Sequence, residues 1–315
     1  MAASLFLLLY GVNPLSVYRE IVTGSVGSLN ALAETLNYTT PILLTALAAI
    51  VCFRCSLWNI GAEGQLYLGA IVTAGLGLQT FGLPSFVVLP AVALCAFVAG
   101  AGWAAVPAVL KLRFGASEII VTIMMNFLAM ILATYLISGV WGTGTTPVTR
   151  PIEPAAYLPI LIPGTRLHGN LLVALAAAVI VDLVIRKTVF GYRLRAIGLN
   201  ARAAQVAGIS VKRISFVSFL IAGGIAGLAG FGQVTGIHHA LPSGFSPGFG
   251  YTGIAVAMLG GLNPLWSIVS AFFLAALNVG GQSMQRALGV PVAFVSAIEG
   301  LLLLALLASG ALKRP

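Results

Sequence analysis

The sequence predicts an all-α, polytopic membrane protein, and three observations support this fold class. Of its 315 residues, 59% are hydrophobic and only 7% are charged, whereas soluble globular domains carry about 25% charged residues. The hydrophobic residues form runs close to the ~20 residues that a helix needs to cross a bilayer. The 16 Lys and Arg residues lie mainly in short loops between these runs. Together these features exclude a soluble globular protein.

The apolar runs predict about ten transmembrane helices, including short or broken ones. In chain order they are 1–12, 39–54, 62–81, 85–110, 117–140, 170–186, 213–236, 249–262, 265–283 and 291–311. The first run is short for a membrane span, so we expect a short or truncated helix there. No separate soluble domain fits between the runs, and the sequence therefore predicts one transmembrane domain over 1–315.

Positive charge predicts how these helices are oriented. If the loop 187–212 lies in the cytoplasm, all but four of the 16 Lys and Arg residues fall on the cytoplasmic side, as is usual for membrane proteins. The four exceptions are Arg19, Arg150, Arg166 and Arg286. Both termini are then cytoplasmic. Because topology explains the basic residues, we expect no nucleic-acid partner.

Two outer connections have the composition of ordered structure. The loop 141–169 carries five of the 15 prolines and few charges, which indicates a lid or docking surface rather than a flexible linker. The Gly- and Pro-rich turn 238–250 precedes an apolar run that glycine interrupts. Such short segments are typical of the half helices of transporters.

Polar residues also lie within the apolar runs, where a charge costs several kcal/mol and is functional by default. The acidic ones are Glu63, Glu118 and Glu299. Glu63 lies between Asn59 and Gln65 in a stretch that glycines interrupt, so freed backbone groups and polar side chains can line a pathway there. Alternatively, Glu63 is only a favourable charge at a helix N-terminus.

Glu118, Thr122 and Asn126 are spaced four residues apart, so they share one helix face. We expect this polar stripe to face the interior of the protein rather than lipid. The spacing leaves open whether these side chains contact a substrate or only bond neighbouring helices.

The loop 187–212, expected to be cytoplasmic, contains a predicted short helix that has the features of a docking site for another protein. Asn200 is a good N-cap, Ala201–Ala207 predict the helix, and Gly208 suits the position after it. A helix of this length rises only ~10 Å and is not stable alone, so it needs a partner surface. Ala203, Ala204 and Ala207 are expected to form a small face that fits a groove, flanked by Arg193, Arg195, Arg202 and Lys212.

The sequence offers no complete motif for catalysis, metal binding or nucleotide hydrolysis. The GFSPG stretch at 244–248 has the spacing of a nucleophile elbow, but Pro247 has no backbone N–H for an oxyanion hole. No Lys follows a Gly, as a Walker A motif requires. Cys52 and Cys55 lack further metal ligands nearby, which favours packing. We therefore expect no enzyme activity, no cofactor and no metal site.

Four segments resemble one family, the inner-membrane permeases of ATP-binding-cassette (ABC) importers in the branch of branched-chain amino acid, ribose and nucleoside systems. They are NIGAEGQLYLGA (59–70), FGASEIIVTIMMNFLA (114–129), GYRLRAIGLNARAAQVAGI (191–209) and YTGIAVAMLGGLNPL (251–265). The stretch 59–65 is closest to the nucleoside, or simple-sugar-type, subgroup. The resemblance runs from about residue 14 to the C-terminus.

This resemblance implies the permease subunit of an importer that takes up a nucleoside by alternating access, with a simple sugar as the alternative substrate. It implies an ATPase subunit, a second permease subunit, a periplasmic or lipid-anchored solute-binding protein and the lipids of a bacterial inner membrane as partners. It implies that the short cytoplasmic helix is the coupling helix, with Arg195, Gly198, Asn200, Ala203, Ala204, Ala207 and Gly208. The candidate pathway residues are Asn59, Glu63, Gln65, Glu118, Thr122, Asn126 and Glu299.

Two other classes of protein remain as rivals. A proton-coupled secondary transporter or channel would use Glu63, Glu118 and Glu299 as a proton relay. An intramembrane enzyme is disfavoured because the elbow motif is broken. Trp58, Phe127 and Phe231 can stack on a base, but packing against neighbouring helices is the favoured explanation for each.

Overall fold

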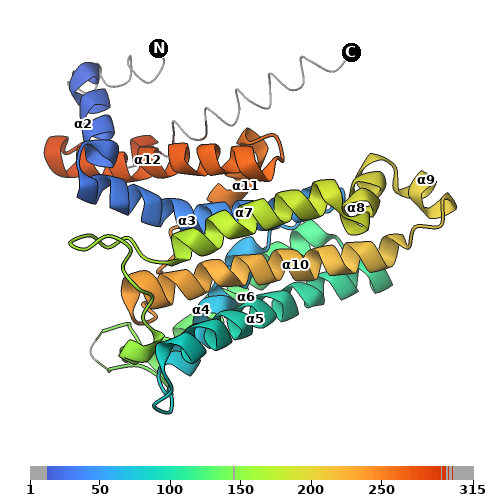
Figure 1. Cartoon of the computed structure of the whole chain (residues 1–315), viewed down its shortest axis with the longest axis horizontal. Coiled ribbons are helices and arrows are strands. Elements are labelled where there is room, and N and C mark those ends of the chain that lie inside the picture. Colours follow the sequence, from blue (N-terminus) through green and yellow to red (C-terminus); the bar gives the residue numbers. More distant parts are fainter. Residues whose placement is uncertain (1–12, 145, 292, 296, 298–299, 301–315) are drawn as a thin grey trace.

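The long apolar runs form helices, and most of them lie side by side along one direction (Figure 1). The computed structural model describes residues 13–144, 146–291, 293–295, 297 and 300. In chain order the elements are α2 (Pro14–Val26), α3 (Leu29–Phe53), α4 (Ala62–Gly77), α5 (Ser85–Phe114), α6 (Glu118–Ser138), the 3₁₀ turn η1 (Pro154–Ala156), α7 (Asn170–Lys187), α8 (Val189–Leu199), α9 (Ala201–Val206), α10 (Val211–Gly232), the π-helical η2 (Gln233–His238), α11 (Phe249–Leu259) and α12 (Pro264–Leu288). The described part is thus helical, with only isolated β-bridges in its loops.

Five of these helices are long and apolar enough to cross a membrane, by length and composition. They are Leu29–Phe53, Ser85–Phe114, Glu118–Ser138, Val211–His238 and Pro264–Leu288. Among the other predicted spans, α4 and α11 have only 16 and 11 residues, and α7 carries acidic and basic residues near its end. The run 1–12 and most of 291–311 lie outside the described residues. The number of about ten spans therefore stays a prediction.

The largest difference from the predicted boundaries is at the start of the chain. α3 begins at Leu29 rather than at 39, because the Ser28 hydroxyl accepts a hydrogen bond from the Ala31 N–H (3.1 Å) and caps an amphipathic first turn. α2 was not predicted. It begins with an Asn13 cap and Pro14, which are local signals that a search for long apolar runs does not detect.

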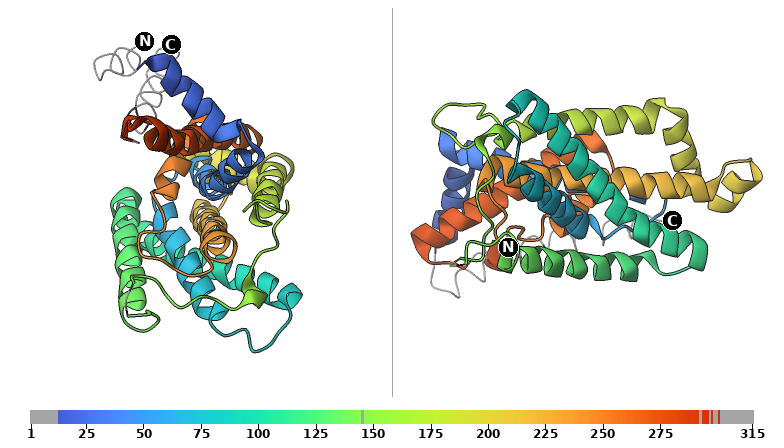
Figure 2. Two further views of the ribbon diagram at one scale, coloured as in Figure 1. Left: turned by 90° about the vertical axis from the view of Figure 1, so that its left-hand side faces the viewer. Right: turned by 90° about the horizontal axis from the view of Figure 1, so that it is seen from below.

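α10 lies in the middle of the bundle and packs against α3, α4 and α5 (Figure 2, left). Glycines allow this close approach: a Cβ atom at Gly223 would lie 2.4 Å from the carbonyl oxygen of Gly100 on α5, and one at Gly230 would lie 2.1 Å from that of Leu66 on α4. The small residues of α10 therefore serve internal helix packing.

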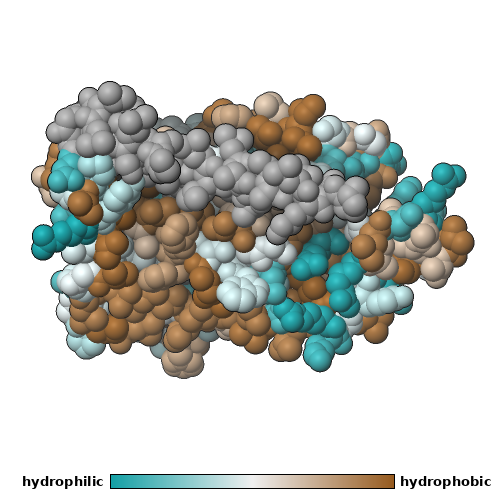
Figure 3. Space-filling view, turned by 90° about the horizontal axis from the view of Figure 1, so that it is seen from above, coloured by the Kyte–Doolittle hydropathy of each residue, from teal (hydrophilic) through white to brown (hydrophobic). Residues whose placement is uncertain are grey.

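The two ends of the bundle differ in character. α8 and α9 project beyond one end, where the chain is rich in Arg and Lys (Figures 1 and 2). Apolar surface dominates the middle of the face in Figure 3, and hydrophilic patches gather toward the end with α8 and α9. At the opposite end, the loop 141–169 is bonded to the segment after α10, through Thr149 N–H to Leu241 O (3.1 Å) and Leu158 N–H to Thr235 O (3.0 Å). This loop is ordered.

Candidate functional site

Two short helices, α4 and α11, begin at the same point in the interior. The backbone N–H of Gly250, in the first turn of α11, donates a hydrogen bond to Glu63 Oε2 over 2.6 Å. Glu63 is in the first turn of α4 and only 2% exposed. A Cβ atom at Gly250 would lie 2.3 Å from the Glu63 nitrogen, so only glycine permits this approach. Glu63 thus places a carboxylate at the positive ends of two helix dipoles.

The chain before α4 is held by side-chain amides. The Asn59 side chain accepts a hydrogen bond from the Gly61 N–H (2.9 Å). The amides of Asn59 and Gln65 pair with each other over 3.2 and 3.3 Å. Both residues are buried. These bonds let an extended stretch interrupt the helix inside the bundle without leaving its polar groups unpaired.

Asn126 of α6 connects this stretch to α11. Its amide nitrogen donates to the Ile60 carbonyl (2.9 Å) and to the Tyr251 hydroxyl (3.1 Å), and its amide oxygen accepts from the Gly64 N–H (2.8 Å). Asn126 is fully buried. Removing this single side chain would therefore leave polar groups on three segments unsatisfied.

The rest of the predicted stripe on α6 also faces the interior. Thr122 is fully buried, and its hydroxyl accepts a hydrogen bond from the Ile60 N–H over 3.3 Å. Glu118 forms an ion pair with Lys111 at the end of α5, with Nζ and Oε2 2.5 Å apart. We refer to Asn59, Glu63, Gln65, Glu118, Thr122 and Asn126 as the polar cluster. The structure brings these six predicted pathway residues together, whereas Glu299 lies outside the described residues.

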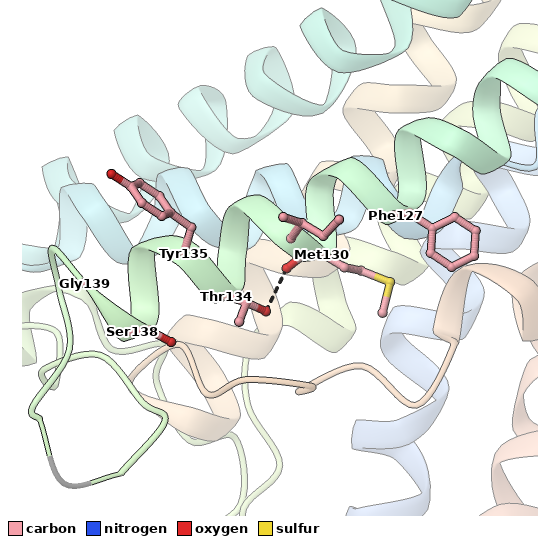
Figure 4. Close-up of a pocket in the computed structure, with 7 residues that line it drawn as sticks. Phe127, Met130, Thr134, Tyr135, Ser138 and Gly139 are labelled. Atoms are coloured by element: carbon pink, nitrogen blue, oxygen red, sulfur yellow. Dashed lines mark hydrogen bonds between the residues drawn. The ribbon is translucent and has the colours of Figure 1, made fainter.

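The aromatic candidates do not lie around this cluster as one group. Phe231 is buried in the core. Trp58 is half exposed and packs on Phe53 with ring centroids 5.0 Å apart. Phe127 is exposed and borders a hollow of about 650 Å³ whose lining residues all come from α6 and the residue after it (Figure 4). Because one helix alone lines this hollow, it is a groove on an outward face and not an enclosed site.

The GFSPG stretch at 244–248 and the cysteine pair Cys52 and Cys55 have structural roles. The Ser246 hydroxyl oxygen accepts hydrogen bonds from the N–H groups of Gly248 (3.3 Å) and Phe249 (3.2 Å), so it supports the start of α11. Cys52 and Cys55 are free thiols buried in the core. No group of three His, Cys, Asp or Glu side chains in the described part of the chain is placed to hold a metal ion.

The short helix predicted within the loop 187–212 forms as α9, one residue shorter than predicted. Asn200 caps it by accepting a hydrogen bond from the Ala203 N–H (3.0 Å), and Gly208 follows with φ of +81°. One expectation is wrong. Ala204 is 5% exposed and belongs to the core of its own chain, so it does not share an outward face with Ala203 and Ala207, which are exposed. The chain turns back at Ile209, whose N–H bonds to the Ala204 carbonyl, and this turn covers Ala204.

Sequence reasoning missed the two most exposed apolar side chains of this end of the molecule. Leu199 and Val206 are 90% and 87% exposed, one before and one within α9. A large apolar side chain in solvent marks an interaction surface when it does not stand alone. The available signal was a Leu directly before, and a Val within, the Ala-rich segment 200–208.

The C-terminal end of α8 is hydrogen-bonded to the turn that follows α3 and leads to the polar cluster. Gly198 O accepts a hydrogen bond from the Ser56 hydroxyl (2.9 Å), and a Cβ atom at Gly198 would lie 2.2 Å from the Arg54 carbonyl oxygen. Arg54 Nε in turn donates to the Leu262 carbonyl (3.0 Å), just after α11. The predicted residue Arg195 donates from Nε to the Gly191 carbonyl (3.4 Å) within α8.

Comparisons with known proteins agree with this architecture. Residues 31–307 match the family described as "Branched-chain amino acid transport system / permease component". The chain is 36% identical to the guanosine ABC transporter permease protein NupP of Bacillus subtilis, over 99% of this chain and 91% of NupP. It is also 36% identical to the glucose ABC transporter permease protein TsgB13 of Haloferax volcanii, over 96% and 83% of the two chains. It is 30% identical to the nucleoside ABC transporter permease protein NupB of Lactococcus lactis, over 95% and 85%. No solved structure matches the chain significantly.

Proposed function

Because the chain belongs to the family of branched-chain amino acid transport system permease components, we propose that it carries a nucleoside across the membrane in an ATP-driven importer. The chain is a multi-pass membrane protein and a permease subunit of an ABC transporter, and it is not itself an enzyme, since the ATPase is a separate subunit. This membership rejects the two rival classes, the proton-coupled transporter or channel and the intramembrane enzyme.

The observation that carries the nucleoside assignment is the 36% identity to NupP over 99% of this chain. A simple sugar is the second candidate substrate, because the glucose permease TsgB13 is equally similar at 36% identity. Both substrates are neutral and rich in hydroxyl groups, so they place similar demands on a pathway.

The polar cluster supports a neutral substrate. In transporters with broken helices, the positive N-terminal ends of half helices often bind an anionic group of the substrate. Here the Glu63 carboxylate already accepts the Gly250 N–H at the start of α11 (2.6 Å). An incoming carboxylate, such as that of an amino acid, would compete with the Glu63 carboxyl group for this N–H. A nucleoside or sugar would not.

We infer that the substrate passes beside the polar cluster. Asn59 and Gln65 offer amide groups, and Asn126 and Thr122 hold the interrupted stretch in place. Glu118, paired with Lys111, lies at the end of the stripe nearer the predicted cytoplasmic loops. Glu299 is retained in this proposal on the sequence argument alone. The single transmembrane permease domain over 1–315 and its about ten spans belong to the same proposal.

We propose that α9 is the coupling helix and that the ATPase binds it through exposed groups. Leu199 and Val206 supply apolar contacts, Ala203 and Ala207 allow close approach, and Arg195 with the other basic residues of the loop 187–212 attracts an acidic rim. Asn200 and Gly208 fix the two ends of the helix, and Ala204 fixes it to its own chain. Gly198 connects α8 to the turn before α4.

This attachment suggests how ATP hydrolysis drives alternating access. A displacement of α9 moves α8, which contacts the turn at Arg54 and Ser56. The same turn bonds to Leu262 after α11. Both half helices, whose starts meet at Glu63, are therefore reached from one contact with the ATPase.

The remaining parts of the proposal concern partners and location. The basic loop 187–212 and the loop 141–169 lie at opposite ends of the bundle (Figure 1). This separation supports placing the two loops on opposite sides of the membrane, with a periplasmic or lipid-anchored solute-binding protein at the loop 141–169. Cytoplasmic termini and a bacterial inner membrane are proposed from the distribution of Lys and Arg and from the family. The exposed outward face of α6 (Figure 4) can meet membrane lipids or a second permease subunit.

Uptake by cells that express the complete transporter tests the substrate. We expect ATP-dependent accumulation of tritiated guanosine that continues when the proton gradient is collapsed and stops when ATP is depleted. Unlabelled uridine, ribose and glucose should be compared as competitors. Accumulation of glucose without guanosine would overturn the nucleoside assignment in favour of the sugar.

A further inference from the structure

A cavity of about 260 Å³ lies between the outer parts of α3, η2 and α12 and the start of α11. Its volume is a little below the roughly 300–1,000 Å³ of pockets for drug-sized ligands, so it suits a small solute. None of the predicted pathway residues lines it. Phe249, which does, directly precedes Gly250, the residue bonded to Glu63. The cavity therefore ends one residue away from the polar cluster.

Gln233 is the unusual member of the lining. The residue is only 5% exposed and it lines the cavity, and no hydrogen bond of its side-chain amide is found in the described part of the chain. Gln233 is also the first residue of the π-helical segment η2, and interruptions of this kind occur frequently at functional sites. An amide that lines a cavity and has no partner in the protein is free to bond a ligand with hydrogen-bonding groups.

Two aromatic rings define the inner side of the cavity. Tyr38 of α3 and Phe249 of α11 meet edge to face, with ring centroids 5.1 Å apart and an interplanar angle of 73°. Phe249 is buried. Any of the nucleic-acid bases can stack on such a ring, because every base has a π face. This pair of rings therefore suits a base-bearing solute.

The outer side of the cavity carries both acidic and basic side chains. Glu34, Arg166 and Arg286 line it, and no ion pair between them is formed in the described structure. Gln282 adds an exposed amide on α12. Ribose hydroxyls both donate and accept hydrogen bonds, so they suit a rim that offers carboxylate, guanidinium and amide groups together.

We propose that this outer cavity binds the nucleoside during its passage, with the Gln233 amide bonded to the base edge, the base against Phe249 and Tyr38, and the ribose at the charged rim. This inference rests on the proposed function and deepens it, since it assigns the substrate a site separate from the polar cluster. The outer cavity is then the place from which the nucleoside advances to the start of α11.

Thiol protection tests the site directly. In the purified complete transporter, Cys95→Ala removes the exposed cysteine of the chain, and Cys52 and Cys55 are buried. Gln282→Cys then places a reactive thiol in the rim. Saturating guanosine should slow its labelling by a water-soluble thiol reagent about tenfold, while the exposed control Gln79→Cys, away from the cavity, should be labelled at an unchanged rate. Equal labelling of Gln282→Cys with and without guanosine would overturn the site.

Uptake by substituted transporters tests the role of the amide. Gln233→Leu keeps the approximate size of the side chain and removes its hydrogen-bonding groups, so guanosine uptake should fall about tenfold. The matched control Gln79→Leu should keep the normal rate. Guanosine protection that survives in the Gln233→Leu, Gln282→Cys double variant would contradict the assignment of Gln233.

The two levels of the proposal fail in different ways. If the wild-type transporter accumulates glucose and no nucleoside, both the proposed substrate and this site assignment are wrong. If it accumulates guanosine but Gln282→Cys is not protected and Gln233→Leu transports normally, only the site assignment is wrong.

Discussion

The Ser56 hydroxyl donates a hydrogen bond to the Gly198 carbonyl oxygen over 2.9 Å, although 142 positions separate the two residues. Ser56 adopts a left-handed backbone conformation (φ 55°) in the turn after α3, and Gly198 lies in the last turn of α8. This contact joins the loop proposed to receive the ATPase to the turn that precedes the polar cluster. It makes the route of mechanical coupling testable with single substitutions.

The first prediction concerns this contact. In Gly198→Ala, the new Cβ atom would lie 2.2 Å from the Arg54 carbonyl oxygen, so α8 must separate from the turn. We expect guanosine uptake to fall about tenfold or more, while the ATPase subunit still binds and hydrolyses ATP. Uptake and ATP hydrolysis should be measured on the same reconstituted transporter.

Gly102→Ala is the matched control, because a Cβ atom at Gly102 meets no atom within 4 Å. It should transport normally. Normal uptake by Gly198→Ala, in turn, would show that close packing of α8 on the turn is not needed for coupling.

The second prediction concerns α9, the proposed coupling helix. Val206 is 87% exposed, so Val206→Glu should not disturb folding but should place a charge where we expect an apolar contact with the ATPase. We expect the ATPase subunit to be lost on co-purification. Val206→Met, which keeps an apolar side chain, should retain it. Retention of the ATPase by Val206→Glu would remove Val206 from the docking surface.

Ala204 gives a contrasting result. Ala204 is buried in its own chain, so Ala204→Glu should lower the amount of folded permease itself. The two substitutions therefore separate a folding defect from a docking defect on the same short helix.

The observed helix boundaries differ in how well the sequence predicts them. α5, α6 and α12 begin within one residue of the predicted boundaries, because each is a continuous apolar run that starts at a Pro- or Ser-containing turn. The N-cap Asn200 was also predictable, since capping is local. The orientation of Ala204 was not, because it depends on where the chain returns after Gly208.

Contacts between distant segments were the main gap for the candidate site. The sequence left Glu63 open between a pathway residue and a helix-start charge, and the partner that defines its position, Gly250, is 187 positions away. The stripe on α6 was predictable from helical periodicity, but its bonds to Ile60 and Tyr251 were not. Gln233 gave no local signal beyond an amide within an apolar run.

The third prediction tests whether Glu63 acts in the substrate pathway or only supports the start of α11. Glu63→Ala leaves the buried Gly250 N–H without an acceptor, which costs about 1–3 kcal/mol and should lower the Tm of the purified permease by several degrees. Glu63→Gln keeps an accepting oxygen and removes only the charge. We expect this variant to stay within about 1 kcal/mol of the wild-type stability and to lose most guanosine uptake. Wild-type uptake by a stable Glu63→Gln variant would mean that Glu63 only supports the start of α11.

The last prediction concerns pH and the outer end of the bundle. His168, directly before α7, is buried, and its Nε2 has no hydrogen-bond partner in the described structure. Burial lowers the pKa of His168 to about 4, and the nearby His239 acts in the same direction. The unfolded chain, with a His pKa of about 6.5, therefore binds more protons than the folded chain as pH falls below this value. The stability of the outer end is intact above pH ~6.5 and is lost progressively toward pH ~4.

At pH 5 the cost at this one histidine is about 2 kcal/mol, from 1.36 kcal/mol per pKa unit. His168→Phe keeps a ring beside Gly236 and cannot be protonated. Thermal unfolding of the purified permease at pH 7.5 and pH 5.0 should show a larger loss of Tm for the wild type than for His168→Phe. His239 is present in both proteins, and its repulsion of a protonated His168 is part of the difference that this comparison measures. An equal loss in both would mean that His168 becomes protonated in the fold at little cost, and that its burial does not make the outer end sensitive to acid.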